Sequence, residues 1–346
     1  MASRTNINSH TNAQLLLAQF AFDGPTRGSK RLWRYEKNHN IELQIGLKSA
    51  TAHKGHFKYP PHPGKEEQLE DRLNREVEQP VNKFLADLKY SVFHLNSTQR
   101  DHMAKYITTQ FHRSAHRKSL KLDQRMTLKA LQEVAADEKM VAQIAECYSY
   151  ETKQTVTPEQ AVDGLHQMIA RYSTDEQSQR GYFEMVENMM EYRDETLIAG
   201  EWERVYTDAN NPFVIGDAPV VTWNRVDGIP VPGVGFGEPD VEVLFPIAPT
   251  ACLHILPRIQ RTRRVRTPTV REVNEAQAAF ATQHCFSNIN SIDLDAVLQQ
   301  KFGTLRMGES GFNIDGKFDS KKHMFESLIN VVGIRHPPLL IDLQRK

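Results

Sequence analysis

Apolar residues recur at helical spacing through residues 66–200, whereas the chain on either side of this block alternates as strands do. Leu69 and Leu73 begin the helical pattern, and strand-like segments occupy 31–47 and 202–256. Because helices and strands are segregated along the chain, we expect an α+β fold. In it, a mixed or antiparallel sheet is built from N-terminal and C-terminal parts, and a large helical insertion packs against this sheet.

The same pattern divides the chain into four expected parts. Residues 1–65 contribute an N-terminal helix and a hairpin that join the sheet, and residues 66–200 form the helical block. Residues 201–290 are a strand-rich part with a following helix. Residues 291–346 form a C-terminal helix and an irregular tail.

Composition excludes several classes of protein. Lys plus Arg and Asp plus Glu both number 43, so the chain has no formal net charge and is not a globally basic nucleic-acid coat. No stretch approaches the roughly 18 apolar residues of a membrane span, and the N-terminus lacks the apolar core of a secretory signal. The odd set of Cys147, Cys252 and Cys285 favours buried thiols over a disulfide framework. These features predict a soluble cytoplasmic protein.

Short motifs follow one another in a fixed order between residues 10 and 290. They are His10 before Leu15–Phe20, Leu32-Trp33-Arg34-Tyr35, Gln110-Phe111-His112-Arg113, Phe213–Val220, Phe245–Pro249 and Asn274. Their order resembles domain-of-unknown-function family 4238, which is bacterial and uncharacterised. The resemblance therefore implies a family but no activity.

The chain departs from this family pattern at three places. Thr11-Asn12 replaces Val-Pro, and Gly216 and Ala248 stand where the family usually carries Ser. The matching polar residues that remain are His10, Arg113, Asp217 and Asn274.

A helix predicted over 99–121 places Gln110 and Arg113 beside its apolar face, so both side chains are expected to be buried. A buried Arg needs an acid or a phosphate-like ligand. Asp217, in a tight turn after an apolar strand, is a candidate for that acid. The alternative is a turn Asp that binds its own backbone two residues on.

These residues suggest one composite site. The expected catalytic residues are His10, Asp217 and Arg113, and the expected substrate-binding residues are Gln110, Asn274 and Arg117. In this hypothesis Arg113 holds an anion through its planar fork, and Asp217 and His10 exchange protons or bind a divalent ion. The alternative is that His10 and Asn274 are structural, one satisfied in the core and the other a buried amide.

His112 and His116 have the spacing of a metal pair, but the helical phase places them opposite the apolar stripe, with Lys105 and Thr109. The Glu of the zincin motif is also missing. We therefore expect a solvated basic face and no metal site there, and the cofactor stays open.

Two local basic clusters stand out on the neutral chain. Arg258–Arg266 holds five Arg in nine residues, and the 100–121 helix is also basic. Such clusters suggest an anionic ligand or nucleic acid as a partner, with a solvated turn as the alternative. No membrane partner is expected, and the oligomeric state stays open.

Two functions are consistent with these features. One is a hydrolase that acts on a phosphate-containing or nucleic-acid substrate. The other is a non-enzymatic binding or interaction protein in which the same polar residues form a structural network.

Overall fold

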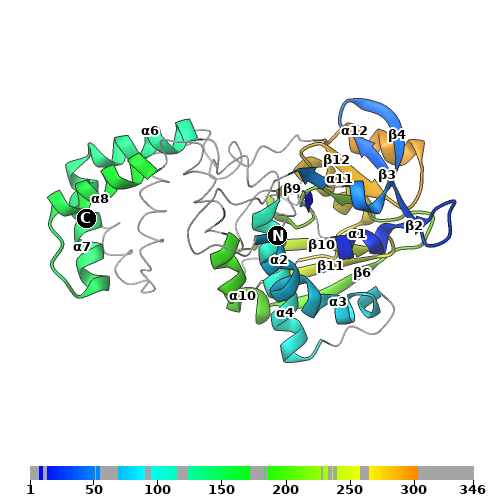
Figure 1. The fold of residues 1–346 in the computed structure, drawn as a ribbon, viewed down its shortest axis with the longest axis horizontal. Coiled ribbons are helices and arrows are strands. Elements are labelled where there is room, and N and C mark those ends of the chain that lie inside the picture. The colour runs from blue at the N-terminus through cyan, green and yellow to red at the C-terminus, as the bar shows by residue number, and fades with distance from the viewer. Residues whose placement is uncertain are drawn as a thin grey trace, which may run out of the picture. The chain divides into compact units, whose positions relative to one another are not determined.

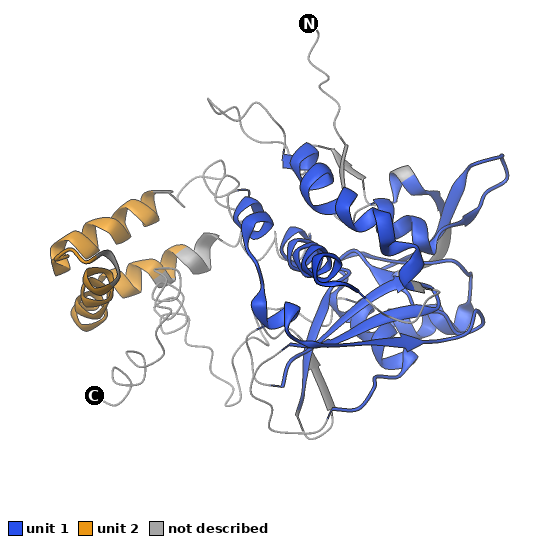
Figure 2. Cartoon of the chain, turned by 90° about the horizontal axis from the view of Figure 1, so that it is seen from below, with its two compact units in different colours: residues 1–120, 182–312 blue, residues 121–181, 313–346 orange. Residues whose placement is uncertain are grey.

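The computed structural model contains all 346 residues in one chain (Figure 1). The structure describes residues 8–10, 14–50, 52–54, 69–89, 95–114, 124–171, 183, 186–226, 229–232, 236, 240–257 and 265–302. Residues 1–120 and 182–312 form unit 1, and residues 121–181 and 313–346 form unit 2 (Figure 2). The predicted helical block 66–200 is therefore divided between the two units.

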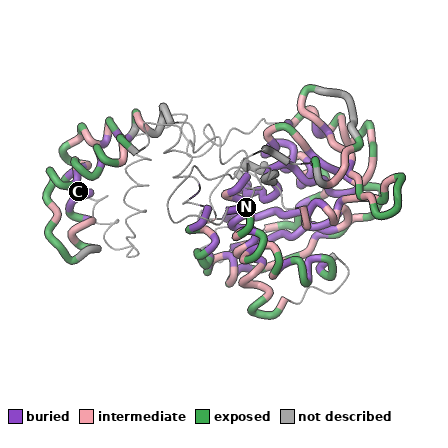
Figure 3. The backbone as a smooth tube through the Cα atoms, viewed as in Figure 1, coloured by how far each residue is buried: buried purple, intermediate pink, exposed green. Residues whose placement is uncertain are grey.

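Unit 1 contains an antiparallel five-stranded sheet in the order β6-β11-β10-β8-β9. Its strands are β6 (Glu201–Tyr206), β8 (Val221–Val226), β9 (Ile229–Pro232), β10 (Glu242–Ala248) and β11 (Ala251–Leu256). Every residue of the central strand β10 is buried (Figure 3). Apart from Glu242 these residues are apolar, as a strand with both faces covered requires.

A second sheet in unit 1 joins the two ends of the described chain. Its strands are β2 (Phe22–Asp23), β3 (Lys30–Glu36), β4 (His39–Gly46), β7 (Ile215–Gly216) and β12 (His284–Ser287). The order is β2-β3-β12-β7, and β4 also pairs with β3. Tyr35 of β3 lies opposite Cys285 of β12. The predicted α+β class with antiparallel sheets is confirmed.

A separate two-stranded pair consists of β1 (Asn8–His10) and β5 (Ala52–Lys54).

The helices of unit 1 vary from single turns to several turns. Among the described residues they include α1 (Gln14–Phe20), η1 (Leu47–Ser49), α2 (Leu69–Leu73), η2 (Asn74–Glu78), α3 (Gln79–Leu85), η3 (Asp87–Lys89), α4 (Ser97–Arg113), α10 (Glu195–Ile198), α11 (Val270–Phe280) and α12 (Ile292–Gln299). Asn96 begins α4 with a capping box, because its side chain accepts from the Gln99 N–H at 2.9 Å and Gln99 reciprocates.

The main core of unit 1 joins helices to the first sheet. Leu16, Leu17 and Phe20 of α1 have no exposed surface, and α1 contacts β10. The ring of Tyr106 in α4 meets Phe245 of β10 edge-on, with centroids 5.9 Å apart. The middle of α4 therefore belongs to the core, which determines what its polar side chains can contact.

Unit 2 has a hydrophobic cluster of its own. Its described helices are α6 (Gln124–Ala135), α7 (Glu138–Thr152) and α8 (Pro158–Arg171). Leu131, Ile144 and Leu165, one from each helix, are buried together. None of the described helices of the chain combines the length and apolar character that crossing a bilayer requires.

Candidate functional site

The Asp217 carboxylate binds the backbone that links α11 to β12. Its oxygens accept hydrogen bonds from the N–H groups of Thr282 (2.7 Å), Gln283 (2.9 Å) and His284 (3.1 Å). The Asp217 N–H donates in return to the His284 carbonyl at 2.9 Å. Burial raises the pKa of Asp217, and the three N–H bonds oppose that rise. The Asp217 carboxylate therefore binds backbone N–H groups that are distant from it in the sequence.

Two buried amides on α11 hold the segment that contains β7. Asn274 donates to a carbonyl and accepts from an N–H of segment 212–214, both at 2.9 Å. Gln277 does the same for segment 216–219, at 2.8 and 2.9 Å. Gln277 did not stand out in the sequence, although it lies three residues after Asn274 and so on the same helix face. Both amides have their donor and acceptor groups satisfied by backbone.

Arg113, the last residue of α4, is fully buried and ion-paired. Its Nη1 lies 2.5 Å from Glu78 Oε1, and its Nη2 lies 3.5 Å from Glu70 Oε1. Burial lowers the pKa of Arg113, but the charges of Glu70 and Glu78 outweigh this, so the pKa is raised. The sequence predicted that a buried Arg113 needs an acid. The described acids that pair with it come from α2 and η2.

A stripe of buried polar groups precedes Arg113 on α4. Tyr106, Thr109 and Gln110 have helical spacing that turns them to the side of Arg113, and all have no exposed surface. Within the described part of the chain, the two hydroxyls and both amide atoms of Gln110 have no hydrogen-bond partner. Burial raises the pKa of Tyr106 well above its usual range.

The burial of Gln110 and Arg113 agrees with the helical phase, but the prediction of a solvated opposite face fails at Thr109. Thr109 has no exposed surface, whereas Lys105 is half-buried. The reason is packing on several sides, since α3, η2 and α10 all contact α4. A helix that neighbouring helices contact on several sides exposes little of its surface to solvent.

A second charged network crosses the first sheet. The Arg225 guanidinium lies 3.0 Å from Glu242 and 3.1 Å from Glu272. His254 lies between two carboxylates, 2.9 Å from Glu242 and 3.3 Å from Glu203. Burial acts to raise the pKa of Glu242, but its contacts with His254 and Arg225 outweigh burial and lower it. The sequence analysis did not identify this network, although Glu242 stands at the start of an otherwise apolar strand.

Several predicted site residues lie partly or wholly outside the described residues. The backbone of His10 pairs with Ala52 in the β1–β5 pair, and its side chain is outside them. Arg117 is also outside. Of the basic segment Arg258–Arg266, the last two residues are described, and Arg266 pairs with Glu272 at 2.5 Å. The contacts of Arg113 and Asp217 given above involve different groups and do not join these two residues.

No cluster of three or more His, Cys, Asp or Glu side chains in the described ranges is arranged to hold a metal ion. His116 lies outside those ranges, so of this histidine pair the structure describes His112 alone. All three cysteines are buried, and burial raises the pKa of Cys252 and Cys285.

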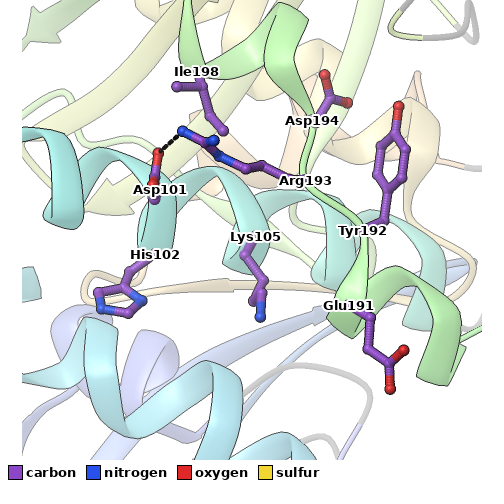
Figure 4. A pocket seen from close by; sticks show the side chains of 8 residues that line it. All are labelled: Asp101, His102, Lys105, Glu191, Tyr192, Arg193, Asp194 and Ile198. Carbon is purple, nitrogen blue, oxygen red and sulfur yellow. Dashed lines mark hydrogen bonds and ion pairs between the residues drawn. The ribbon is translucent and has the colours of Figure 1, made fainter.

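A surface pocket of ≈ 250 Å³ lies between α4 and the segment 191–198 (Figure 4). Its walls include Asp101, His102 and Lys105 from α4, and Glu191, Arg193 and Asp194 from the facing segment. The described residues that were predicted to be catalytic or substrate-binding do not line it.

Comparison with known proteins gives a match to a family model. A family model described as "Protein of unknown function (DUF4238)" matches residues 8–291. No curated protein and no solved structure matches the chain.

Proposed function

The chain belongs to the DUF4238 family, and we propose that it is a non-enzymatic binding protein in which the family's polar motif residues form a structural network. The observation that carries this proposal is the set of hydrogen bonds that the Asp217 carboxylate accepts. Its buried carboxylate accepts from three consecutive backbone N–H groups. A general base must reach the proton that it removes. The Asp217 carboxylate is instead engaged in joining α11 to β12.

The other motif residues favour the same role. Asn274 uses its amide to bind the backbone of segment 212–214, and Arg113 is fully buried against Glu78 and Glu70. Each contact joins parts of the chain that are distant in sequence. Buried polar groups of this kind specify one arrangement of a fold, because a wrong arrangement leaves them unpaired.

Hydrolysis of a phosphate-containing or nucleic-acid substrate is the weaker proposal. Arg113 would have to exchange its carboxylate partners for a substrate anion, and a fully buried guanidinium is not open to such a ligand. In the described part of the basic segment, which is residues 265 and 266, Arg266 is already paired with Glu272. No contact among the described residues favours this function.

The proposal is tested by the effect of Asp217→Asn on stability. An amide at this position keeps one acceptor oxygen but turns an NH₂ group toward backbone N–H groups. We therefore expect Asp217→Asn to lower the free energy of unfolding by about 2–4 kcal/mol. Trp33, Trp202 and Trp223 all lie in unit 1, so tryptophan fluorescence follows the unfolding of that unit. Urea denaturation with this probe gives the free energy.

The matched control is Asp23→Asn, because Asp23 is an exposed acid whose partner is Lys30 at 2.7 Å. Exposed ion pairs contribute little, so this variant should match the parent protein. If Asp217→Asn unfolds at the same urea concentration as the parent, Asp217 is not a structural residue and the proposal fails.

A further inference from the structure

The acids that line the pocket of Figure 4 already have partners. Asp101 lies 3.3 Å from Arg193, and Glu191 lies 3.8 Å from Arg72. The Asp194 carboxylate caps α10, where it accepts from two backbone N–H groups at 3.1 Å each. Asp101 and Asp194 are therefore engaged by the protein itself, whereas Glu191 is mostly exposed and shares Arg72 with Glu76 and Glu187.

The pocket also contains cationic and donor groups that are not engaged. Lys105 and His102 lie three residues apart on α4, so their side chains are neighbours. Neither one makes a hydrogen bond or an ion pair with any residue that the structure describes, in contrast to Arg193, which contacts Asp101 and Glu195. Figure 4 shows both side chains extending from α4, and no interaction joins either of them to another of the residues drawn.

We propose that this pocket binds a small anionic ligand that carries a carboxylate or a phosphate. The Lys105 ammonium contacts the anion, and His102 forms a hydrogen bond with it. The volume of ≈ 250 Å³ lies below the range of roughly 300–1,000 Å³ for drug-sized ligands, so the group that enters the pocket is a small anion. This inference rests on the proposed binding role and gives it a location and a ligand class.

The experiment is a calorimetric titration of the full chain with two probes, inorganic phosphate and succinate, at constant ionic strength. We expect at least one probe to bind. Lys105→Met removes a charge-assisted contact and should weaken that binding by about tenfold or more. Lys105→Arg keeps the positive charge and should retain most of the affinity. Lys83→Met is the control, because Lys83 is an exposed lysine on α3.

The two probes separate the possible sources of the anion. Binding of phosphate alone indicates a phosphorylated ligand, and binding of succinate alone indicates a carboxylate ligand. Binding of neither probe overturns the inference. So does equal binding by the parent protein and a folded Lys105→Met variant, which would mark an adventitious ion only. These results are independent of the proposed structural role of Asp217, because that role is judged by the unfolding of Asp217→Asn.

Discussion

The Arg113 guanidinium, which has no exposed surface, lies 2.5 Å from the Glu78 carboxylate. Arg113 ends α4, whereas Glu78 ends η2, so this ion pair joins two helices that are distant in the sequence. Removing one partner of a buried pair leaves an uncompensated charge, which costs more than the pair contributes. The stability of unit 1 should therefore depend strongly on Glu78.

We predict that Glu78→Gln lowers the free energy of unfolding by about 2–4 kcal/mol, with Glu70 limiting the loss because it still faces Arg113. Urea denaturation followed by tryptophan fluorescence measures the change. Glu76→Gln is the control, since Glu76 pairs with the more exposed Arg72 and should matter less. The double variant Glu78→Leu, Arg113→Met removes both charges of the pair, so it should be more stable than Glu78→Gln. A stable Glu78→Gln variant would contradict this role for the pair.

Helical phase was enough to predict that Gln110 and Arg113 are buried, because that property depends on residues within one helix. The acid that pairs with Arg113 could not be predicted in the same way. Glu78 is one of 43 acidic residues, and its proximity to Arg113 results from tertiary packing. The fold class was predictable for the opposite reason, since segregated helical and strand patterns extend over many residues and average out local errors.

The partners of Asp217 illustrate a second limit of sequence reasoning. They are backbone N–H groups of residues 282–284, and every residue other than proline offers such a group, whatever its side chain. The sheet network around Glu242 depends in turn on strand register, which places His254 and Arg225 on either side of it. A shift of one residue would turn these side chains to the other face.

Replacing Gln110 or Gln277 with Met should change the free energy of unfolding in opposite directions. Both amide atoms of Gln110 are buried and lack a partner among the described residues, so Gln110→Met should raise the free energy of unfolding by about 1–3 kcal/mol. The Gln277 amide makes two backbone hydrogen bonds, so Gln277→Met should lower it by a similar amount. Urea denaturation measures both. A loss of stability in Gln110→Met would indicate that its amide binds an internal water or another polar group.

Gly216 stands where the resemblance to the family led us to expect Ser, and the structure gives a reason for glycine here. A Cβ at this position would lie 2.9 Å from the Gln277 carbonyl oxygen, which is backbone and cannot move alone. We predict that Gly216→Ser destabilises unit 1 by about 1–3 kcal/mol. Gly46→Ser is the control, because a Cβ there would meet the Ser49 hydroxyl at 3.7 Å, an ordinary contact. Thermal unfolding of the two variants should differ, and equal melting temperatures would contradict the steric argument.

Glu272 should make the stability of unit 1 depend on acid pH. Burial acts to raise the pKa of Glu272, but hydrogen bonds from Arg266, Thr269 and Arg225 outweigh it and lower this pKa to about 2. An unfolded Glu titrates near 4.3, so the folded state favours the charged form. This stabilisation is fully present above about pH 4.5 and is lost as the pH falls toward 2. Because solvent reaches part of the side chain, we expect about 1–2 kcal/mol.

The measurement is urea denaturation of the parent protein and Glu272→Gln at pH 7 and pH 3. Other acids titrate in both proteins, so the informative quantity is the difference in free energy between them. Glu272→Gln cannot ionise and should lose less stability on acidification, so the difference should be largest at pH 7. Arg266→Met removes the strongest contact to the carboxylate and should reduce the pH-dependent part of this difference. If the parent and Glu272→Gln lose stability in parallel between these pH values, Glu272 is not the group responsible.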